Sequence, residues 1–203
     1  GDLMGWPDSA MFTTDEIIHN LRYLKQASSF RTRYDYDNLL YIVAGEIVAR
    51  VSGQSWEEFT ESRIMKPLGM NESAASFRRI KDLSNIIDAH VTVDGRLKVV
   101  PKQEAKRHNS VGGIYSNISD MSKWVILQLN RGRHGSSAGE KIFSEEIHRE
   151  MWSPQTVKRV GTTGPYRSNF AFYGLGWNLT DINGYLQVYH TGSHAGIETR
   201  VTM

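Results

Sequence analysis

The amino-acid sequence predicts an α+β fold in a single domain spanning residues 1–203. Apolar residues recur at helical spacing from about residue 13 to 152, and short strand-like segments follow from about residue 170. At 203 residues the chain can bury a substantial core but is too short for two ordinary domains. Helices first and strands later are typical of α+β proteins, so we expect a central helical lobe (13–152) and an antiparallel sheet portion (170–203).

The first helices are predicted from their capping sequences. Residues 13–16 and residues 55–58 are capping boxes, and Pro67 to Met70 ends the helix that starts at the second box. Between the boxes, residues 38–50 predict a helix that stops at a left-handed Gly53. Its apolar face is expected to hold Leu39, Val43, Ile47 and Val51.

Strands and further helices follow in order. Residues 86–100 predict a hairpin that turns at Asp94-Gly95. We then expect helices over 119–130 and 144–152, followed by three strand segments. These segments are 173–179 and 186–190, paired around Asn183-Gly184, and 197–203, which is cut at the chain end.

Composition excludes several classes of function. The chain has 24 Lys and Arg against 22 Asp and Glu, and its basic stretches lack interleaved aromatic residues, so we expect no nucleic-acid partner. The absence of Cys excludes disulfides, thiolate nucleophiles and Cys-ligated zinc. The 7 His residues show no ligand spacing, so we expect neither metal nor cofactor.

Membrane and targeting signals are not predicted either. The longest apolar run, around Leu39 to Gly45, is far shorter than the roughly 18 residues that span a bilayer. The start of the chain, Gly1 to Met4, has no basic segment typical of a targeting signal. We therefore expect no transmembrane segment in this chain.

Two short motifs carry the functional information. His190-Thr191-Gly192, followed by Ser193, matches the wall strand of a penicillin-recognising serine hydrolase, and Tyr36-Asp37-Asn38 is a Tyr-x-Asn element that enters an apolar helix. Each has a purely structural alternative, since Tyr36 could be a packed aromatic and His190 a hydrogen-bonded residue beside a strand-end glycine. The order of further segments around them strengthens the functional interpretation. These segments are Pro67 to Met70, Val111-Gly112-Gly113 with Ser116, Asp120-Met121, and Tyr173-Gly174-Leu175-Gly176-Trp177.

With these motifs in this order along the sequence, the chain resembles the class C β-lactamase and penicillin-binding-protein-like serine hydrolase family over essentially its whole length. The resemblance implies a β-lactamase/transpeptidase-like fold. It also implies that Tyr36 assists proton transfer at the nucleophile, that Asn38 hydrogen-bonds the substrate, and that the strand 190–192 docks the acyl group. The backbone N–H of Ser193 would belong to the oxyanion hole.

Two departures from the family pattern bear on activity. His190 stands where β-lactamases have Lys, so a permanent cation for a substrate carboxylate is replaced by a mostly neutral group, as in esterase-like and aminopeptidase-like relatives. The substrate class, whether β-lactam, D-amino-acid peptide or ester, stays open. No Ser or Thr is followed three positions later by Lys, so the nucleophile motif of the family is absent.

The missing nucleophile leads us to expect a fragment that is inactive by itself. An ordinary Tyr is only ~0.1% phenolate at pH 7, and Tyr36 lacks the Lys of Ser-x-x-Lys that would activate it. An incomplete sheet is also expected, with an unpaired edge along 186–192 that favours self-association. The alternative function is a non-catalytic module that binds a peptide or cell-wall ligand in the same cleft.

Other patterns are weaker. Gly135 to Gly139 matches the Gly-x-Ser-x-Gly nucleophile elbow, but no apolar strand precedes it, so it predicts a loop. Three sequons, at Asn71, Asn117 and Asn178, have meaning only in a eukaryotic secretory protein. The resemblance places the parent protein in the bacterial periplasm or envelope, and the chain itself shows no export signal.

Overall fold

In the computed structural model, residues 12–102, 104, 107–135, 140–161, 166–194 and 196–203 are described. The chain divides into two compact units. The first takes in the residues up to Lys25, Asp37–Lys123 and Ser193–Ile197, and the second consists of Gln26–Tyr36, Trp124–Gly192 and Glu198–Met203. Each unit is treated separately below.

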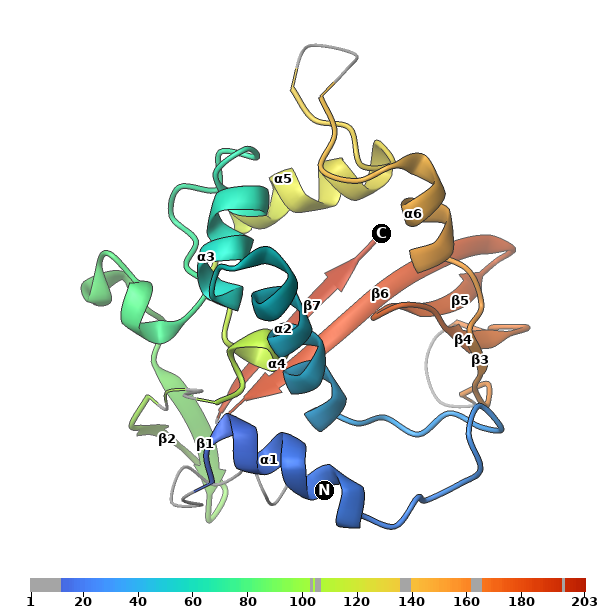
Figure 1. Cartoon of the computed structure of the whole chain (residues 1–203), viewed down its shortest axis with the longest axis horizontal. Coiled ribbons are helices and arrows are strands. Elements are labelled where there is room, and N and C mark those ends of the chain that lie inside the picture. The colour runs from blue at the N-terminus through green and yellow to red at the C-terminus, as the bar shows by residue number, and fades with distance from the viewer. Residues whose placement is uncertain (1–11, 103, 105–106, 136–139, 162–165, 195) are drawn as a thin grey trace. The chain divides into compact units, whose positions relative to one another are not determined.

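Helices and strands follow the predicted order (Figure 1). The α-helices are α1 (Thr14–Asn20), α2 (Leu39–Ser52), α3 (Trp56–Thr60), α4 (Asn109–Gly112), α5 (Ile118–Leu129) and α6 (Glu145–Met151). Shorter helical turns are η2 (Leu21–Tyr23), η3 (Glu61–Met65), η4 (Phe77–Arg79) and η5 (Leu83–Asn85). The strands are β1 (Ala89–Val93), β2 (Arg96–Val100), β3 (Thr156–Val157), β4 (Ala171–Tyr173), β5 (Asn178–Ile182), β6 (Tyr185–His194) and β7 (Ile197–Thr202).

Both capping boxes are present. The Thr13 hydroxyl accepts from the Glu16 N–H before α1, and Ser55 accepts from the Glu58 N–H before α3, each with the reciprocal bond from the glutamate. Such caps use backbone donors that a helix start leaves unpaired. Gly53 ends α2 at φ 69°, the left-handed stop predicted for it.

The buried face of α2 differs from the predicted one. Leu39 is buried as expected, but Ile47 and Val51 are 56% and 84% exposed. The buried positions are Leu39, Ile42 and Gly45. A Cβ on Gly45 would lie 2.5 Å from the Cβ of Ser110 in α4, so the two helices meet where α2 has no side chain. The close approach of α2 to α4 at Gly45 therefore determines which face of α2 is buried, and the widest apolar stripe of the helix does not.

The predicted hairpin is β1 with β2. Its register runs from Ala89 opposite Val100 to Val93 opposite Arg96, and Asp94 and Gly95 turn it at φ 51° and 73°. Positive φ at both turn residues is the requirement of a tight hairpin turn.

The five-stranded sheet has the order β3-β4-β5-β6-β7, and the β3–β4, β4–β5 and β5–β6 pairs are antiparallel (Figure 1). The turn at Asn183-Gly184 between β5 and β6 is confirmed, with both residues at positive φ. The predicted single strand 173–179 is wrong. Tyr173 ends β4, the Gly174 N–H bonds the Trp177 carbonyl at 2.7 Å across a turn, and β5 starts at Asn178. Gly176, at φ 79°, makes that turn possible.

The expected unpaired edge along 186–192 is also wrong. β6 lies between β5 and β7, and Val188 and Met203 exchange backbone hydrogen bonds of 2.9 and 2.8 Å. The physical reason is that β7 follows β6 directly in the chain and fills the ladder that we expected to be open. Self-association through this strand therefore loses its structural basis.

Each unit has its own apolar core. Ile17, Leu39 and Ile42 are at most 2% exposed in the first unit, with Leu21 and Val111 packed against them. In the second unit, Trp177, Leu179 and Val188 lie at the centre. Six partly buried residues surround these three: Trp124, Met151, Trp152, Phe172, Val201 and Met203. Each buried aliphatic side chain contributes about 1.5–3 kcal/mol to stability, so both clusters anchor their elements.

Candidate functional site

Three side chains of the second unit form the candidate site: Tyr36, Tyr173 and His190. The Tyr173 hydroxyl lies 3.1 Å from His190 Nε2. The ring centroid of Tyr36 lies 6.2 Å from that of His190. It lies 6.4 Å from the ring centroid of Tyr173, and these two rings meet edge-on. Tyr36 packs on the other two rings, yet half of the residue, 50%, remains exposed to solvent.

A cation lies over the ring of Tyr173. The ammonium of Lys158 lies 4.4 Å from the ring centroid of Tyr34 and 5.6 Å from that of Tyr173, and it donates to the buried Asn178 carboxamide oxygen. Tyr34 in turn packs on Tyr173 with centroids 5.1 Å apart. Burial lowers the pKa of Lys158, because the charged form loses solvation there.

The loop that carries Tyr36 is held by Asp35. The carboxylate of Asp35 accepts from the Ser28 hydroxyl and, at 3.1 Å, from Arg33 Nε. The Ser28 bond, with a smaller contribution from Arg33, lowers the pKa of Asp35. Tyr34 and Tyr36 flank this anchored residue, and so both rings are positioned by it.

The predicted site residues fall into both units. Tyr36, His190, Thr191 and Gly192 belong to the second unit, whereas Asn38 and Ser193 belong to the first. Along β6, His190 and Gly192 are partly buried while Thr191 and Ser193 are exposed, the alternation typical of a strand.

Two of these residues have local roles that the sequence did not indicate. Asn38 is the N-cap of α2, yet its side chain makes no capping bond, because Asp37 accepts from the Leu39 N–H at 2.8 Å. A Cβ on Gly192 would lie 2.6 Å from Thr199 Oγ1, so β7 already occupies the space above this glycine.

Sequence reasoning missed Tyr173, Lys158 and Tyr34 as site residues. Tyr173 stands in the motif 173–177 that supports the resemblance, and this was the signal available; in the structure β5 lies between its strand β4 and the strand β6 that carries His190. Tyr34 lies two residues before Tyr36, where strand-like spacing could have suggested a shared face. Nothing in the sequence around Lys158 pointed to the site.

No group of three or more potential metal ligands (His, Cys, Asp or Glu) occurs among the described residues. No described helix is long and apolar enough to cross a bilayer. The Gly-x-Ser-x-Gly pattern at 135–139 lies, apart from Gly135, outside the described residues. The side chains brought together around Tyr173 carry phenol, imidazole and ammonium groups.

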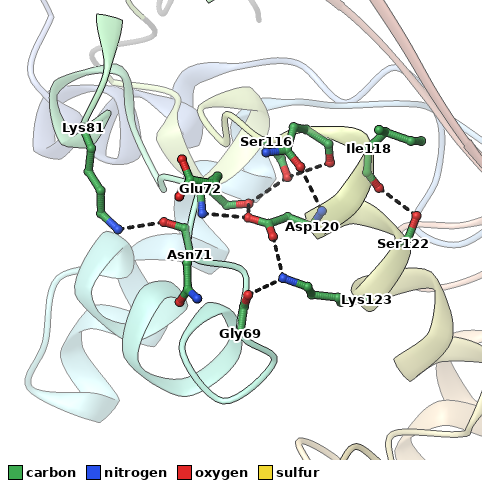
Figure 2. A network of polar contacts seen from close by, with 11 residues as sticks. Gly69, Asn71, Glu72, Lys81, Ser116, Ile118, Asp120, Ser122 and Lys123 are labelled. Atoms are coloured by element: carbon green, nitrogen blue, oxygen red, sulfur yellow. Dashed lines mark hydrogen bonds and ion pairs between the residues drawn. The ribbon is translucent and has the colours of Figure 1, made fainter. Parts of the chain in front are cut away.

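A second polar cluster, in the first unit, centres on Asp120, which is 2% exposed (Figure 2). Its carboxylate accepts from the Glu72 N–H and the Ser73 hydroxyl, both at 2.9 Å, and from Lys123 at 2.8 Å. Lys123 also donates to the Gly69 carbonyl. Burial acts most strongly and would raise the pKa of Asp120, but the bonds from Lys123, Ser73 and Glu72 together outweigh it and lower the pKa. All these donors are used internally, so the cluster ties α5 to the turn after η3.

A cavity of about 370 Å³ also lies in the first unit. Its charged lining is already paired: Arg78 with Glu104 at 2.5 Å, and Arg79 with Glu61 at 2.8 Å. Asn109 donates to Glu57 at 2.6 Å. The two arginines are thus each paired with a carboxylate, and Glu57 accepts from a neutral amide.

The fold recurs in solved structures of penicillin-binding and amidase proteins. The octameric penicillin-binding protein homologue of Pyrococcus abyssi matches with a TM-score of 0.72 at 25% identity, over 95% of this chain and 41% of that one. The D-amino acid amidase of Ochrobactrum anthropi SV3 matches with a TM-score of 0.60 at 18% identity, over 94% and 56%. The architecture is thus that of the penicillin-recognising α+β proteins.

The chain belongs to the β-lactamase family, whose sequence profile matches residues 2–202. Among curated relatives, the unguisins hydrolase ungD' of Aspergillus campestris is 26% identical over 100% of this chain and 36% of its own length. The chain spans about a third of the length of the two Aspergillus relatives, 36% and 35%. Since these relatives are fungal, family membership does not establish the bacterial source that the resemblance suggested.

Proposed function

We propose that the chain is the central and C-terminal part of a serine hydrolase that acts through an acyl-enzyme on amide, ester or β-lactam bonds. The observation that carries this proposal is the packing of Tyr36 on His190, with ring centroids 6.2 Å apart, in a chain of the β-lactamase family. The two residues come from motifs at opposite ends of the sequence. Their proximity supports a shared role beyond the local structure of either motif.

Each residue has a defined role in the proposal. Tyr36, with its side chain half exposed, transfers the proton to and from the nucleophile. Asn38 hydrogen-bonds the substrate, and its carboxamide is not used to cap α2. The strand His190-Thr191-Gly192 docks the acyl group through its backbone, and the Ser193 N–H stabilises the oxyanion.

This chain alone is proposed to be inactive. The sequence contains no Ser-x-x-Lys, so neither the nucleophile nor the lysine that activates Tyr36 is present. The same observation favours a second candidate function, a binding module that holds a peptide or cell-wall ligand without acylation.

Covalent labelling tests both functions. The 203-residue chain and the longer protein that contains it are incubated with a fluorescent penicillin and a fluorescent fluorophosphonate, then analysed by denaturing gel and intact mass. We expect label on the longer protein and none on this chain. Stoichiometric labelling of this chain, lost in Ser137→Ala, would overturn the proposal in favour of the elbow serine. Saturable binding without label on the longer protein would establish the binding module.

A further inference from the structure

Lys158 has a fixed place beside the candidate site. Its backbone N–H donates to the Ala171 carbonyl at 2.9 Å, which places the residue directly after β3 and against β4. Its ammonium is held by the Asn178 oxygen and by the faces of Tyr34 and Tyr173. Asn178 is only 8% exposed, so the oxygen that holds the ammonium is itself fixed.

The charge of Lys158 is not neutralised locally. No described carboxylate forms an ion pair with it, and none forms one with His190. Its partners are an amide oxygen and two aromatic rings, which attract the cation without cancelling its charge. The field of the ammonium therefore acts on Tyr173, whose ring centroid is 5.6 Å away.

This field decides which atom donates between Tyr173 and His190. A cation against the ring stabilises negative charge on the phenol oxygen, so the Tyr173 hydroxyl becomes the stronger donor. His190 Nε2, 3.1 Å away, then accepts, and the imidazole proton lies on Nδ1.

We propose that Lys158 is a positioning residue that acts through Tyr173 to hold His190 as the neutral imidazole with its proton on Nδ1. Lys158 does not itself contact the reacting atoms. In this arrangement His190 has a single N–H donor, on Nδ1.

A substrate class follows from this arrangement and rests on the proposed function. A neutral N–H donor suits the carbonyl of an ester or amide, whereas a free carboxylate would gain most from a full positive charge. Tyr36, packed on both His190 and Tyr173, is set by the same pair of rings. We therefore expect substrates whose acyl side is uncharged to be preferred over those that carry a carboxylate there.

Nitrogen NMR of the imidazoles tests the tautomer directly and needs no activity. In ¹⁵N-labelled chain at pH 7.5, the His190 signal, assigned by its loss in His190→Gln, should show a protonated Nδ1 and an unprotonated Nε2. Lys158→Arg keeps the cation and should keep this pattern. Lys158→Gln and Tyr173→Phe should move His190 towards the Nε2–H form, while Lys98→Met, at an exposed lysine of β2, should change nothing.

Three results would overturn the proposal: an Nε2–H or doubly protonated His190 in the unmodified chain, the same tautomer in Lys158→Arg and Lys158→Gln, or no response to Tyr173→Phe. In the longer protein, Lys158→Gln should lower kcat/KM for an uncharged ester by about 10-fold, the equivalent of one hydrogen bond. Failure of the proposed hydrolase function would remove this kinetic effect but leave the NMR result, so the two proposals fail separately.

Discussion

The Asp120 cluster of the first unit and the Tyr36 cluster of the second differ in how their polar groups are used. The carboxylate of Asp120 is 2% exposed and accepts three hydrogen bonds from within the chain. Tyr36 is 50% exposed, and its ring contacts those of Tyr173 and His190. The buried carboxylate is bonded within the chain, whereas the phenol of the other cluster is half exposed.

The difference fits a structural role for the Asp120 cluster and the chemical role that we propose for the Tyr36 cluster. A buried, fully bonded carboxylate contributes to stability because its loss leaves several partners unpaired. An accessible phenol beside an imidazole contributes little to stability, but it can reach a substrate. If this distinction is right, substitutions in the two clusters should affect different measurements.

The largest expected effect is on catalysis. In the longer protein, Tyr36→Phe should lower turnover of an ester or amide reporter by roughly 100-fold or more, because proton transfer typically contributes that much. The melting temperature should hardly change, since the ring and its packing remain. Tyr23→Phe, at a tyrosine that is 72% exposed, is the matched control and should leave turnover intact. Unchanged turnover in Tyr36→Phe would leave Tyr36 with only a packing role.

The second expected effect is on stability. Asp120→Ala should lower the free energy of unfolding by about 3 kcal/mol, because Lys123, Ser73 and the Glu72 N–H lose their acceptor. Urea denaturation followed by circular dichroism measures it. Glu46→Gln, which breaks the exposed ion pair with Arg50, is the control and should cost no more than about 0.5 kcal/mol. Equal losses in the two variants would remove the distinction between the clusters.

Acid should weaken the Asp120 cluster. The pKa of Asp120 is lowered in the folded chain, and so is that of Asp181, where burial opposes the shift but bonds from Asn169 and Phe170 prevail. Their contribution to stability is therefore fully present above the unfolded-state pKa near 4 and is lost as pH falls through the lower folded-state values. Urea midpoints between pH 7 and 2.5 should fall only at the acid end. In Asp120→Asn that fall should be shallower, and an unchanged fall would show that other groups cause it.

The elements could be predicted from the sequence wherever a local signal fixes them. Capping boxes at Thr13 and Ser55, the left-handed stop at Gly53 and the turns at Asp94 and Asn183 depend only on neighbouring residues, and all were located correctly. Strand partners depend on distant residues. The place of β7 beside β6 and the turn inside 173–177 were therefore predicted wrongly.

The candidate site could be predicted only in part for the same reason. The motifs that contain Tyr36 and His190 were visible in the sequence, and their roles remain predictions. Lys158 and Tyr34 meet Tyr173 only through tertiary contacts that no spacing encodes. A lysine between two tyrosines has no sequence signature, since surface lysines are common.

The smallest of these effects tests why α2 buries the face that it does. Gly45→Ala should destabilise the chain by about 1–2 kcal/mol, because the new methyl group meets Ser110 at 2.5 Å and α4 must shift, although alanine otherwise favours a helix. Gly112→Ala is the control, since a Cβ there meets no atom within 4 Å. The double variant Gly45→Ala with Ser110→Gly should recover much of the loss by removing the clash. A stabilising Gly45→Ala would mean that helix propensity outweighs the contact, and the apolar stripe would again have to explain the packing of α2.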